Sequence, residues 1–262
     1  MRVHLYALCW NDMHMLPFTF RHYGPWVDRF FIFDDGSDDG SVEYLAARSD
    51  TDVVPFKREN PDSLILSAVL LFDQIWKQSI GVADWVVITD LDEHLTHPDM
   101  PAYLMQQKSN GITAVPALGY QMICSDLPHA DSLLCRDYRM GAPWSQMSKL
   151  SIFRPDKIIE TNFKPGRHRA HPVGEIVFPA RDDVVNLHYK YLGLANTHAR
   201  HRAANMRLGA ADRAKTWGHK YAWSEAELGA DFAKFQAASV DVGSIDHHSV
   251  HPEPRWWRPQ RP

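Results

Sequence analysis

The chain has 262 residues, 45% of them hydrophobic, which is enough to build one generous domain with a sizeable core. It contains no apolar run of roughly 18 residues, so no transmembrane helix is predicted. The net charge of −4 hides an asymmetry: residues 1–135 carry 8 Lys and Arg against 19 Asp and Glu, and residues 136–220 carry 16 against 7. We expect cations to bind in the acidic part and an anionic diphosphate or acceptor to bind in the basic part.

Strand and helix patterns alternate over the first hundred residues. The opening residues read as a strand, not as a secretory signal. This alternation is typical of an α/β fold with a mainly parallel, doubly wound sheet flanked by helices, which binds ligands at the carboxyl ends of its strands. The expected strands cover residues 3–9, 30–33, 51–56 and 84–88, and the expected helices cover residues 11–27, 41–48 and 63–80.

The pattern changes after Pro101. Residues 125–148 are irregular and are predicted to form a loop over the site. Residues 246–262 read as an irregular tail rich in Pro, Trp and Arg, and no linker divides residues 1–245, which we expect to form a single domain. Further strands are predicted at 111–119, 149–153 and 184–189, and C-terminal helices at 192–217 and 224–238.

An acidic stretch, Asp90-Leu91-Asp92-Glu93, follows the apolar run of residues 85–88. Two carboxylates at the end of a buried strand can hold a hard divalent ion, and such an ion completes its shell with phosphate oxygens. The plain alternative is a solvated acidic loop. A second acidic segment, residues 34–41, contains four Asp and two Gly after another strand, and it either binds a ribose or base or forms a turn that binds only water or calcium.

The two acidic segments in this order resemble those of the GT-A glycosyltransferases, in the family-2-like bacterial branch with an Asp-x-Asp motif. Asn11-Asp12, Leu16-Pro17 and His22-Tyr23 are similar to the opening helix of that branch, and residues 186–190, Asn-Leu-His-Tyr-Lys, are similar to its late His-Tyr motif. The resemblance covers roughly residues 2–205. It implies a GT-A type fold with a nucleotide-binding half, residues 1–100, and an acceptor half with the C-terminal helices, residues 101–245.

The resemblance also implies roles for single residues. Asp92 would be the direct ligand of Mn²⁺ or Mg²⁺, and His188 would be a second ligand from the far end of the fold. Asp35 would bind the nucleobase, with Asp34 at the ribose and Asp90 at the ribose or a metal-bound water. Asn11 and Lys190 complete the expected nucleotide-sugar site, with Arg154 and Lys149 as further candidates to bind the phosphates.

A catalytic base is harder to find, because the acidic pair that this branch carries on its acceptor side is missing. Asp126, Asp137 and Glu175 are candidates, Asp137 is preferred, and inversion and retention both stay open. The basic run of residues 167–171, Arg-His-Arg-Ala-His, is expected either to bind an acceptor phosphate or to shape the donor pocket.

The predicted function is metal-dependent transfer of a sugar from a nucleotide-diphosphate donor, UDP above all, to a glycan or polysaccharide acceptor. A sugar nucleotidyltransferase and a non-catalytic nucleotide-sugar or glycan-binding module are the alternatives. Nucleic acid is not an expected partner, since the basic residues are dispersed. The cysteines, Cys9, Cys124 and Cys135, lack metal-type spacing and predict a cytoplasmic location, with a possible peripheral contact with the inner membrane through residues 255–261.

Overall fold

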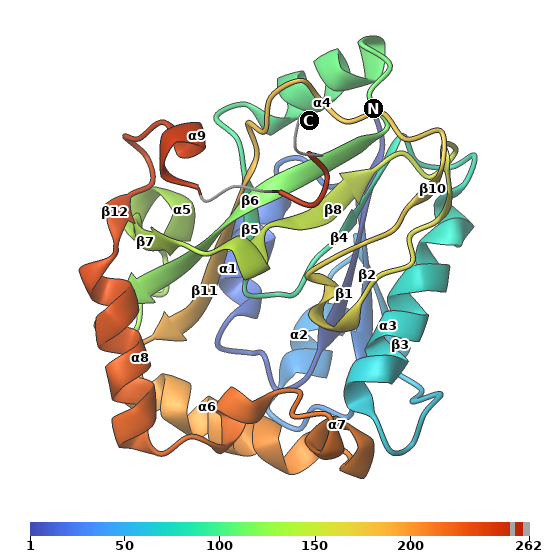
Figure 1. Ribbon diagram of the computed structural model, residues 1–262. Coiled ribbons are helices and arrows are strands. Elements are labelled where there is room, and N and C mark those ends of the chain that lie inside the picture. The colour runs from blue at the N-terminus through green and yellow to red at the C-terminus, as the bar shows by residue number, and fades with distance from the viewer. Residues whose placement is uncertain (252–254, 259–262) are drawn as a thin grey trace.

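Four parallel strands form one half of the sheet in the computed structural model, which describes residues 1–251 and 255–258. They lie in the order β3-β2-β1-β4, so β1 is in the middle and each connection crosses over through a helix (Figure 1). Their bounds are Val3–Cys9 for β1, Arg29–Asp34 for β2, Thr51–Pro55 for β3 and Trp85–Ile88 for β4.

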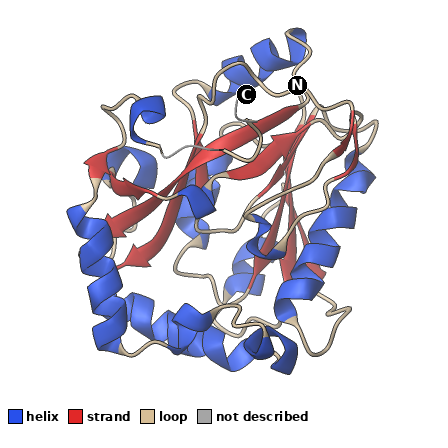
Figure 2. Ribbon diagram, in the orientation of Figure 1, coloured by secondary structure: helices blue, strands red, loops and turns tan. Residues whose placement is uncertain are grey.

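Helices cover both faces of these strands (Figure 2). Successive side chains of a strand point to opposite faces, so Leu5 packs in the core that includes residues of α1 (Leu16–Tyr23) and α2 (Ser41–Ala46), while Tyr6 packs in the core under α3 (Leu64–Gln74). The predicted α/β class with a doubly wound sheet is therefore confirmed. The helices are shorter than predicted: the 3₁₀ turn η1 (Ile75–Ser79) replaces the last part of the expected 63–80 helix.

The second half of the sheet mixes directions. β8 (Lys149–Phe153) runs antiparallel between β4 and β6 (Ala114–Cys124), and β11 (Val185–Leu192) pairs in parallel with β6. β5 (Glu93–Thr96) pairs antiparallel with β11. β7 (Met140–Pro143) pairs with β6, and β12 (Val240–Asp241) pairs with β7 at the edge of the sheet. β9 (Ile158–Glu160) and β10 (Val173–Gly174) form a separate two-stranded sheet.

Several elements lie where the sequence suggested none. β5 and the helix α4 (Met100–Ser109) were not predicted, because Glu93 and His94 look like loop residues although both are fully buried. The segment of residues 125–148, expected to be irregular, contains the short helix α5 (Leu134–Asp137), β7 and the 3₁₀ turn η2 (Ser145–Met147).

Of the C-terminal helices, the first two lie across the end of the sheet at which β1 and β2 finish, the third packs along β6 and β7, and the last lies toward the opposite end (Figure 1). The single helix expected at 192–217 is instead two, because Leu208 is extended and Gly209 caps a new helix. These elements are α6 (Leu194–Arg207), α7 (Ala210–Ala214), the 3₁₀ turn η4 (His219–Ala222), α8 (Glu225–Ala237) and α9 (His247–Val250). Among the described residues, no helix is long and apolar enough to cross a bilayer.

The tail packs against the domain as far as it is described. Trp257 is 4% exposed, and its indole N–H donates to Asp182 at 3.0 Å. Arg255 and Arg258 also pair with Asp182, at 2.8 and 2.6 Å. The rest of the segment for which membrane contact was predicted, Pro259, Gln260 and Arg261, lies outside the described residues, so that contact stays a prediction.

Candidate active site

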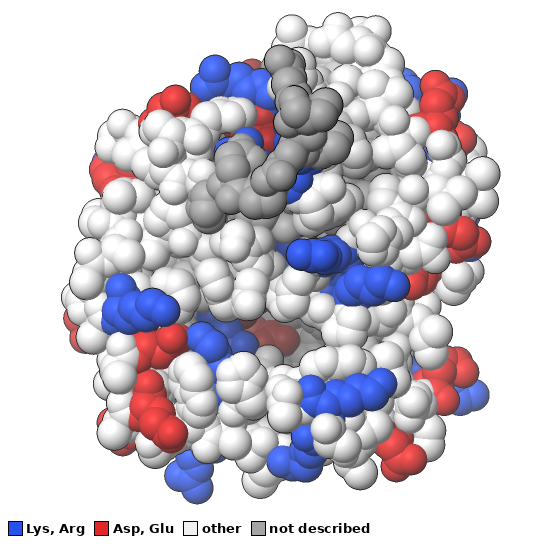
Figure 3. All heavy atoms as spheres, viewed as in Figure 1, with Lys and Arg blue, Asp and Glu red and all other residues white. Residues whose placement is uncertain are grey.

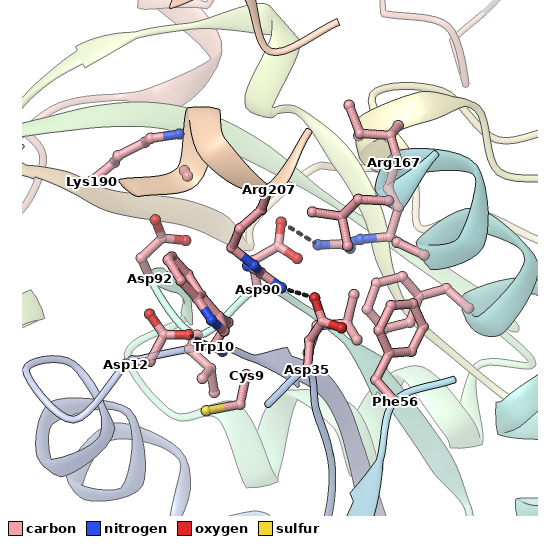
Figure 4. A pocket seen from close by; sticks show the side chains of 18 of the residues that line it. Cys9, Trp10, Asp12, Asp35, Phe56, Asp90, Asp92, Arg167, Lys190 and Arg207 are labelled. Atoms are coloured by element: carbon pink, nitrogen blue, oxygen red, sulfur yellow. Dashed lines mark hydrogen bonds and ion pairs between the residues drawn. The ribbon is translucent and has the colours of Figure 1, made fainter. Parts of the chain in front are cut away.

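Parallel strands bring the acidic segments together. Since β1, β2 and β4 point the same way, Trp10, Asp35 and Asp90 follow their carboxyl ends at one edge of the sheet. They line a cavity of about 320 Å³ together with Asp92 and His188 (Figure 4). From outside, this face is hollowed, with acidic atoms at the floor and Lys and Arg side chains around the rim (Figure 3).

The antiparallel pairing of β11 with β5 explains how His188 reaches this edge. His188 lies opposite Glu93 in the register, one residue beyond Asp92. Its Nε2 is 3.5 Å from Oδ2 of Asp92. Two residues almost a hundred positions apart therefore meet, as the resemblance implied.

Gln121 determines the tautomer of His188. The Gln121 amide nitrogen donates to the carbonyl oxygens of Met122 and His188, at 3.0 and 3.2 Å, which leaves its Oε1 as an acceptor. This Oε1 lies 2.8 Å from Nδ1 of His188, so Nδ1 carries a hydrogen and Nε2 is the ring nitrogen that faces Asp92. When that nitrogen carries no hydrogen, its lone pair and the Asp92 carboxylate are two acceptors that a cation between them would satisfy.

The Asp92 carboxylate is strongly held in its charged form. Burial raises its pKa, but the protonated form of His188 and the Lys190 ammonium outweigh burial and keep the pKa of Asp92 well below its ordinary value. Asp92 is therefore an anion at every physiological pH, which suits a ligand of a hard divalent ion.

Glu93 lies under the acidic loop. It is fully buried and pairs with Lys149, and its other oxygen accepts from Arg167 at 2.9 Å. Arg167 also contacts Asp90 at 3.2 Å and donates to the carbonyl of Ile88 at 2.8 Å. Glu93 thus holds two cations against the loop that carries Asp90, and sequence analysis had left it without a role.

Asp35 lies at the opposite end of the cavity and is already paired. Arg58 donates to its Oδ2 at 2.7 Å, and Arg207 of α6 forms a second ion pair with it (Figure 4). The Arg207 guanidinium also stacks 3.9 Å from the Trp10 ring centroid. Burial lowers the pKa of Arg207 to about 10, and it remains charged at neutral pH.

Asn11 and Asp34 do not line the cavity. Asp34 accepts hydrogen bonds from the backbone of Gly36 and Ser37, both at 3.0 Å, and so shapes its own turn. The Asn11 amide exchanges two hydrogen bonds with Asp38, at 2.7 and 2.8 Å. Both residues hold the acidic loop against the first strand, and their predicted contact with the nucleotide stays a prediction.

Lys190 lines both this cavity and a smaller one of about 140 Å³. Asp12, Asp92 and Arg200 also line the smaller cavity. The Lys190 ammonium donates to the Tyr221 hydroxyl at 3.1 Å. Burial lowers the pKa of Lys190, but Tyr221 and Asp92 outweigh it and the pKa lies above its ordinary value.

Asp12 is the neighbour of Asp92 in this second cavity. Burial raises the pKa of Asp12 to about 6, although Arg200 pairs with it at 2.7 Å.

Asp137, the preferred candidate for the catalytic base, lies outside the site. It ends α5, pairs with Arg136 at 2.7 Å, accepts from the backbone of Leu133 at 2.9 Å, and lines neither cavity. Arg154 pairs with Asp156 and is also outside both cavities.

Sequence reasoning did not assign several residues that line the cavity. Arg200 and Arg207 come from α6. Arg167, in the turn after β9, also lines the cavity and belongs to the basic run 167–171, which was expected either to bind an acceptor phosphate or to shape the donor pocket. One signal was available, because Arg200, Ala204 and Arg207 are spaced four and seven apart, which puts them on one face of a helix. No pattern indicated that this face would lie over the strand ends.

The donor set fits a divalent ion only in part. Within residues 1–251 and 255–258, no three His, Cys, Asp or Glu side chains converge as a ready metal site. Asp92 and His188 offer one carboxylate oxygen and one ring nitrogen, so the ion would need further ligands from a substrate or from water. Mg²⁺ and Mn²⁺ commonly bind in this way, with one or two protein ligands and substrate phosphates.

Comparison with known proteins gives only distant likenesses. No protein-family model matches the sequence, and no curated protein matches it. Glucosyl-3-phosphoglycerate synthase from Mycobacterium tuberculosis, solved with Mn²⁺, UDP and phosphoglyceric acid, is 18% identical with a TM-score of 0.29, over 45% of this chain and 43% of its own. S. aureus TarS is 10% identical with a TM-score of 0.39, over 89% and 43%.

A nucleotide-diphospho-sugar transferase from Desulfovibrio desulfuricans G20, itself described as putative, is 13% identical with a TM-score of 0.30, over 46% of this chain and 59% of its own. The chain thus spans 43% of the length of each of the first two structures. At these identities and TM-scores the likenesses carry no weight in the proposals below.

Proposed function

We propose that this protein is a metal-dependent GT-A glycosyltransferase of the family-2-like branch, which moves a sugar from a nucleoside diphosphate, UDP in the first instance, to a glycan acceptor. The observation that carries this proposal is the pair of acceptors formed by Asp92 and His188, 3.5 Å apart at the edge of the sheet. The pair lies in a cavity whose other walls supply cations.

Asp92 and His188 would hold the Mn²⁺ or Mg²⁺ ion, which when bound acts as a Lewis acid for the diphosphate leaving group. Asp92 is suited to this because it stays ionised. His188 is suited because its hydrogen bond to Gln121 turns the free nitrogen toward Asp92.

Arg167 and Lys190 would meet the remaining negative charge of the diphosphate. They enter from opposite sides of the acidic loop, one beside Asp90 and the other near Asp92. Their long side chains are fixed, by Glu93 in one case and by Tyr221 in the other, so little rotamer freedom is lost when a phosphate binds.

The nucleoside would occupy the end of the cavity near Asp35. The Trp10 ring offers a flat face there, and Asp35 offers a carboxylate that can accept from a base imide. Arg207 now occupies both positions, since it stacks on Trp10 and pairs with Asp35. Binding of the base at Asp35 therefore requires Arg207 to move aside.

A panel of nucleotide sugars tests this proposal. With Mn²⁺ present, we expect release of UDP from at least one UDP-sugar, abolished by EDTA and reduced on the order of 100-fold or more in Asp92→Asn. Asp156→Asn, which changes an exposed aspartate outside the cavity, is the matched control. Formation of a UDP-sugar from UTP and a sugar 1-phosphate, with pyrophosphate released, would instead identify a nucleotidyltransferase.

The cytoplasm, the source of nucleoside diphosphate sugars for glycan assembly in this proposal, is the proposed location. The three cysteines are free.

A further inference from the structure

The loop of residues 164–169 connects the proposed active site with another cavity. Gly166 and Arg167 line the first cavity. Lys164, His168 and Arg169, from the same loop, line a neighbouring cavity of about 390 Å³. A ligand in that cavity would therefore lie one loop away from Asp90, which Arg167 contacts at 3.2 Å.

The backbone brings the two exposed cations of this loop together. The amide of Lys164 donates to the carbonyl of Arg169 at 2.9 Å, which closes the loop at its base. Gly166 and Arg167 both have positive φ, 67° and 55°, and these angles make the tight reversal. The backbones of Lys164 and Arg169 are therefore adjacent in space, and both residues border the same cavity.

Within the described residues, no acidic side chain neutralises the charges of Lys164 and Arg169. Neither Lys164 nor Arg169 takes part in an ion pair, and none of the described residues that line the cavity is acidic. Arg167, by contrast, is neutralised by Glu93 and Asp90. Like charges held close together repel, and the positive potential that they create favours an anionic ligand.

His168 adds a polar group, and Arg255, which also lines the cavity, pairs with Asp182. Burial lowers the pKa of His168 to about 4, so its ring is neutral at pH 7, and its Nδ1 donates to the carbonyl of Gln146 at 2.6 Å.

An indole completes the lining. Trp256 is half-buried, and its Nε1 is buried without a hydrogen-bond partner among the residues that the structure describes. A buried indole N–H ordinarily has a partner. A hydroxyl of a bound sugar would supply one, and the flat ring offers an apolar face to the C–H face of a sugar.

We propose that this cavity is the acceptor site and that the acceptor is an anionic glycan. Its phosphate or carboxylate binds between Lys164 and Arg169, and one of its sugar rings lies against Trp256. The inference rests on the proposed transferase function, because only a transferase needs an acceptor beside Asp90. It also explains why two arginines of the basic run 167–171 line different cavities. Arg167 lines the first cavity, where the donor is proposed to bind, and Arg169 lines the proposed acceptor cavity.

Binding to protein already saturated with UDP and Mg²⁺ tests the inference, since the donor cavity is then occupied. Ligand-observed NMR titration would compare glucose 6-phosphate, glucose and inorganic phosphate. We expect glucose 6-phosphate to bind at least tenfold more tightly than either of the others, and Lys164→Ala/Arg169→Ala to remove that advantage. Arg202→Ala/Lys234→Ala, which neutralises two exposed cations that do not line the cavity, is the control and is expected to bind as the wild type does.

Three results would overturn the inference. They are equal binding of glucose and glucose 6-phosphate, undiminished binding in the double variant, or binding of inorganic phosphate as tight as that of the sugar phosphate. Co-sedimentation with phosphatidylglycerol vesicles that depends on Lys164 and Arg169, without binding of the sugar phosphate, would assign the surface to a membrane and overturn it as well. Failure of UDP to bind in the first step would count against the proposed function instead, so the two failures are distinguishable.

Discussion

At the scale of single residues, the orientation of one amide sets the chemistry of the candidate metal site. Gln121 is 1% exposed, and its amide nitrogen is committed to two carbonyl oxygens. Only its oxygen remains for His188, so the free nitrogen of the imidazole must face Asp92. A residue that touches neither substrate nor ion thereby controls whether His188 can act as a ligand.

We expect Gln121→Leu to weaken binding of Mn²⁺ in the presence of UDP by roughly 10- to 100-fold, because Leu fills the same space but cannot fix the tautomer of His188. Titration of Mn²⁺ at a constant UDP concentration measures the change. Gln106→Leu, on the exposed side of α4, is the control. An unchanged Mn²⁺ affinity in Gln121→Leu would show that the tautomer is set in another way.

Glu93 stabilises the loop that carries Asp90 and Asp92. It is buried between Lys149 and Arg167, and burial raises its pKa, but these two cations outweigh burial and lower the pKa well below the ordinary value of 4.5. The unfolded chain therefore binds the proton of Glu93 more tightly than the folded chain does. The resulting stability is complete above pH 4.5 and is lost as the pH falls below that value.

Glu93→Gln should lower the free energy of unfolding at pH 7 by about 3–5 kcal/mol, because two buried cations lose their counter-ion. The wild type should lose stability as the pH falls below 4.5, and the variant should lose less over the same range. Urea unfolding between pH 3 and pH 7 measures both effects, with the exposed Glu43→Gln as the control. Parallel pH profiles for wild type and Glu93→Gln would contradict this account.

At the scale of elements, α6 carries Arg200 and Arg207, which line the cavity that holds Asp92 and His188, and α7 follows it. α7 is attached to the start of α3 by Asp212, which is fully buried and accepts from Ser63 and from the amide of Leu64. Gly209, which precedes α7, packs against the backbone just before α3, since a Cβ at this position would lie 2.0 Å from the carbonyl oxygen of Asp62. The position of Arg207 therefore depends on a close backbone contact two residues away.

Gly209→Ala should force α7 away from α3 and destabilise the protein by about 1–3 kcal/mol. Gly229→Ala in α8 is a matched control, because its new Cβ would meet only Leu194 at 3.6 Å and alanine favours a helix. Urea unfolding compares the two variants. Equal stabilities would mean that the contact with Asp62 is relieved at no cost.

The four parallel strands and the helices between them were largely predictable, since periodic apolar patterns mark β1 to β4 and those helices. β5 was not, because its charged and polar residues, Glu93 and His94, are buried through ion pairs and ring stacking that no local pattern reveals. The meeting of Asp92 with His188 was expected from motif resemblance. The arrival of Arg200 and Arg207 depends on how distant segments pack, and sequence spacing does not encode that.

At the scale of the whole molecule, the acidic and basic parts of the chain meet at one cavity. The acidic loops come from residues 1–135, whereas Arg167, Lys190 and Arg207 come from the basic part. The charge asymmetry seen in the sequence is therefore a consequence of building one site from two regions. The described part of the tail lies on Asp182, and its Trp256 borders the neighbouring cavity that Lys164 and Arg169 also line.

Trp257 should anchor this tail. We expect Trp257→Ala to cost about 3–5 kcal/mol of unfolding free energy, because the indole is 4% exposed and donates to the buried Asp182. The half-buried Trp217→Ala should cost less. Thermal unfolding of both variants measures the difference, and a Trp257 variant as stable as the wild type would show that the tail contributes nothing to the fold.

The measurement that bears most directly on the central claim is calorimetric titration of UDP with Mn²⁺, with EDTA, and in two variants. UDP should bind the wild type with Mn²⁺, lose most of its affinity in EDTA, and bind Asp92→Asn and His188→Ala as weakly with Mn²⁺ as without it. The control Asp156→Asn should behave as the wild type does. UDP binding that is equally tight with Mn²⁺, in EDTA and in Asp92→Asn would contradict a metal site at Asp92 and His188, and with it the proposed function.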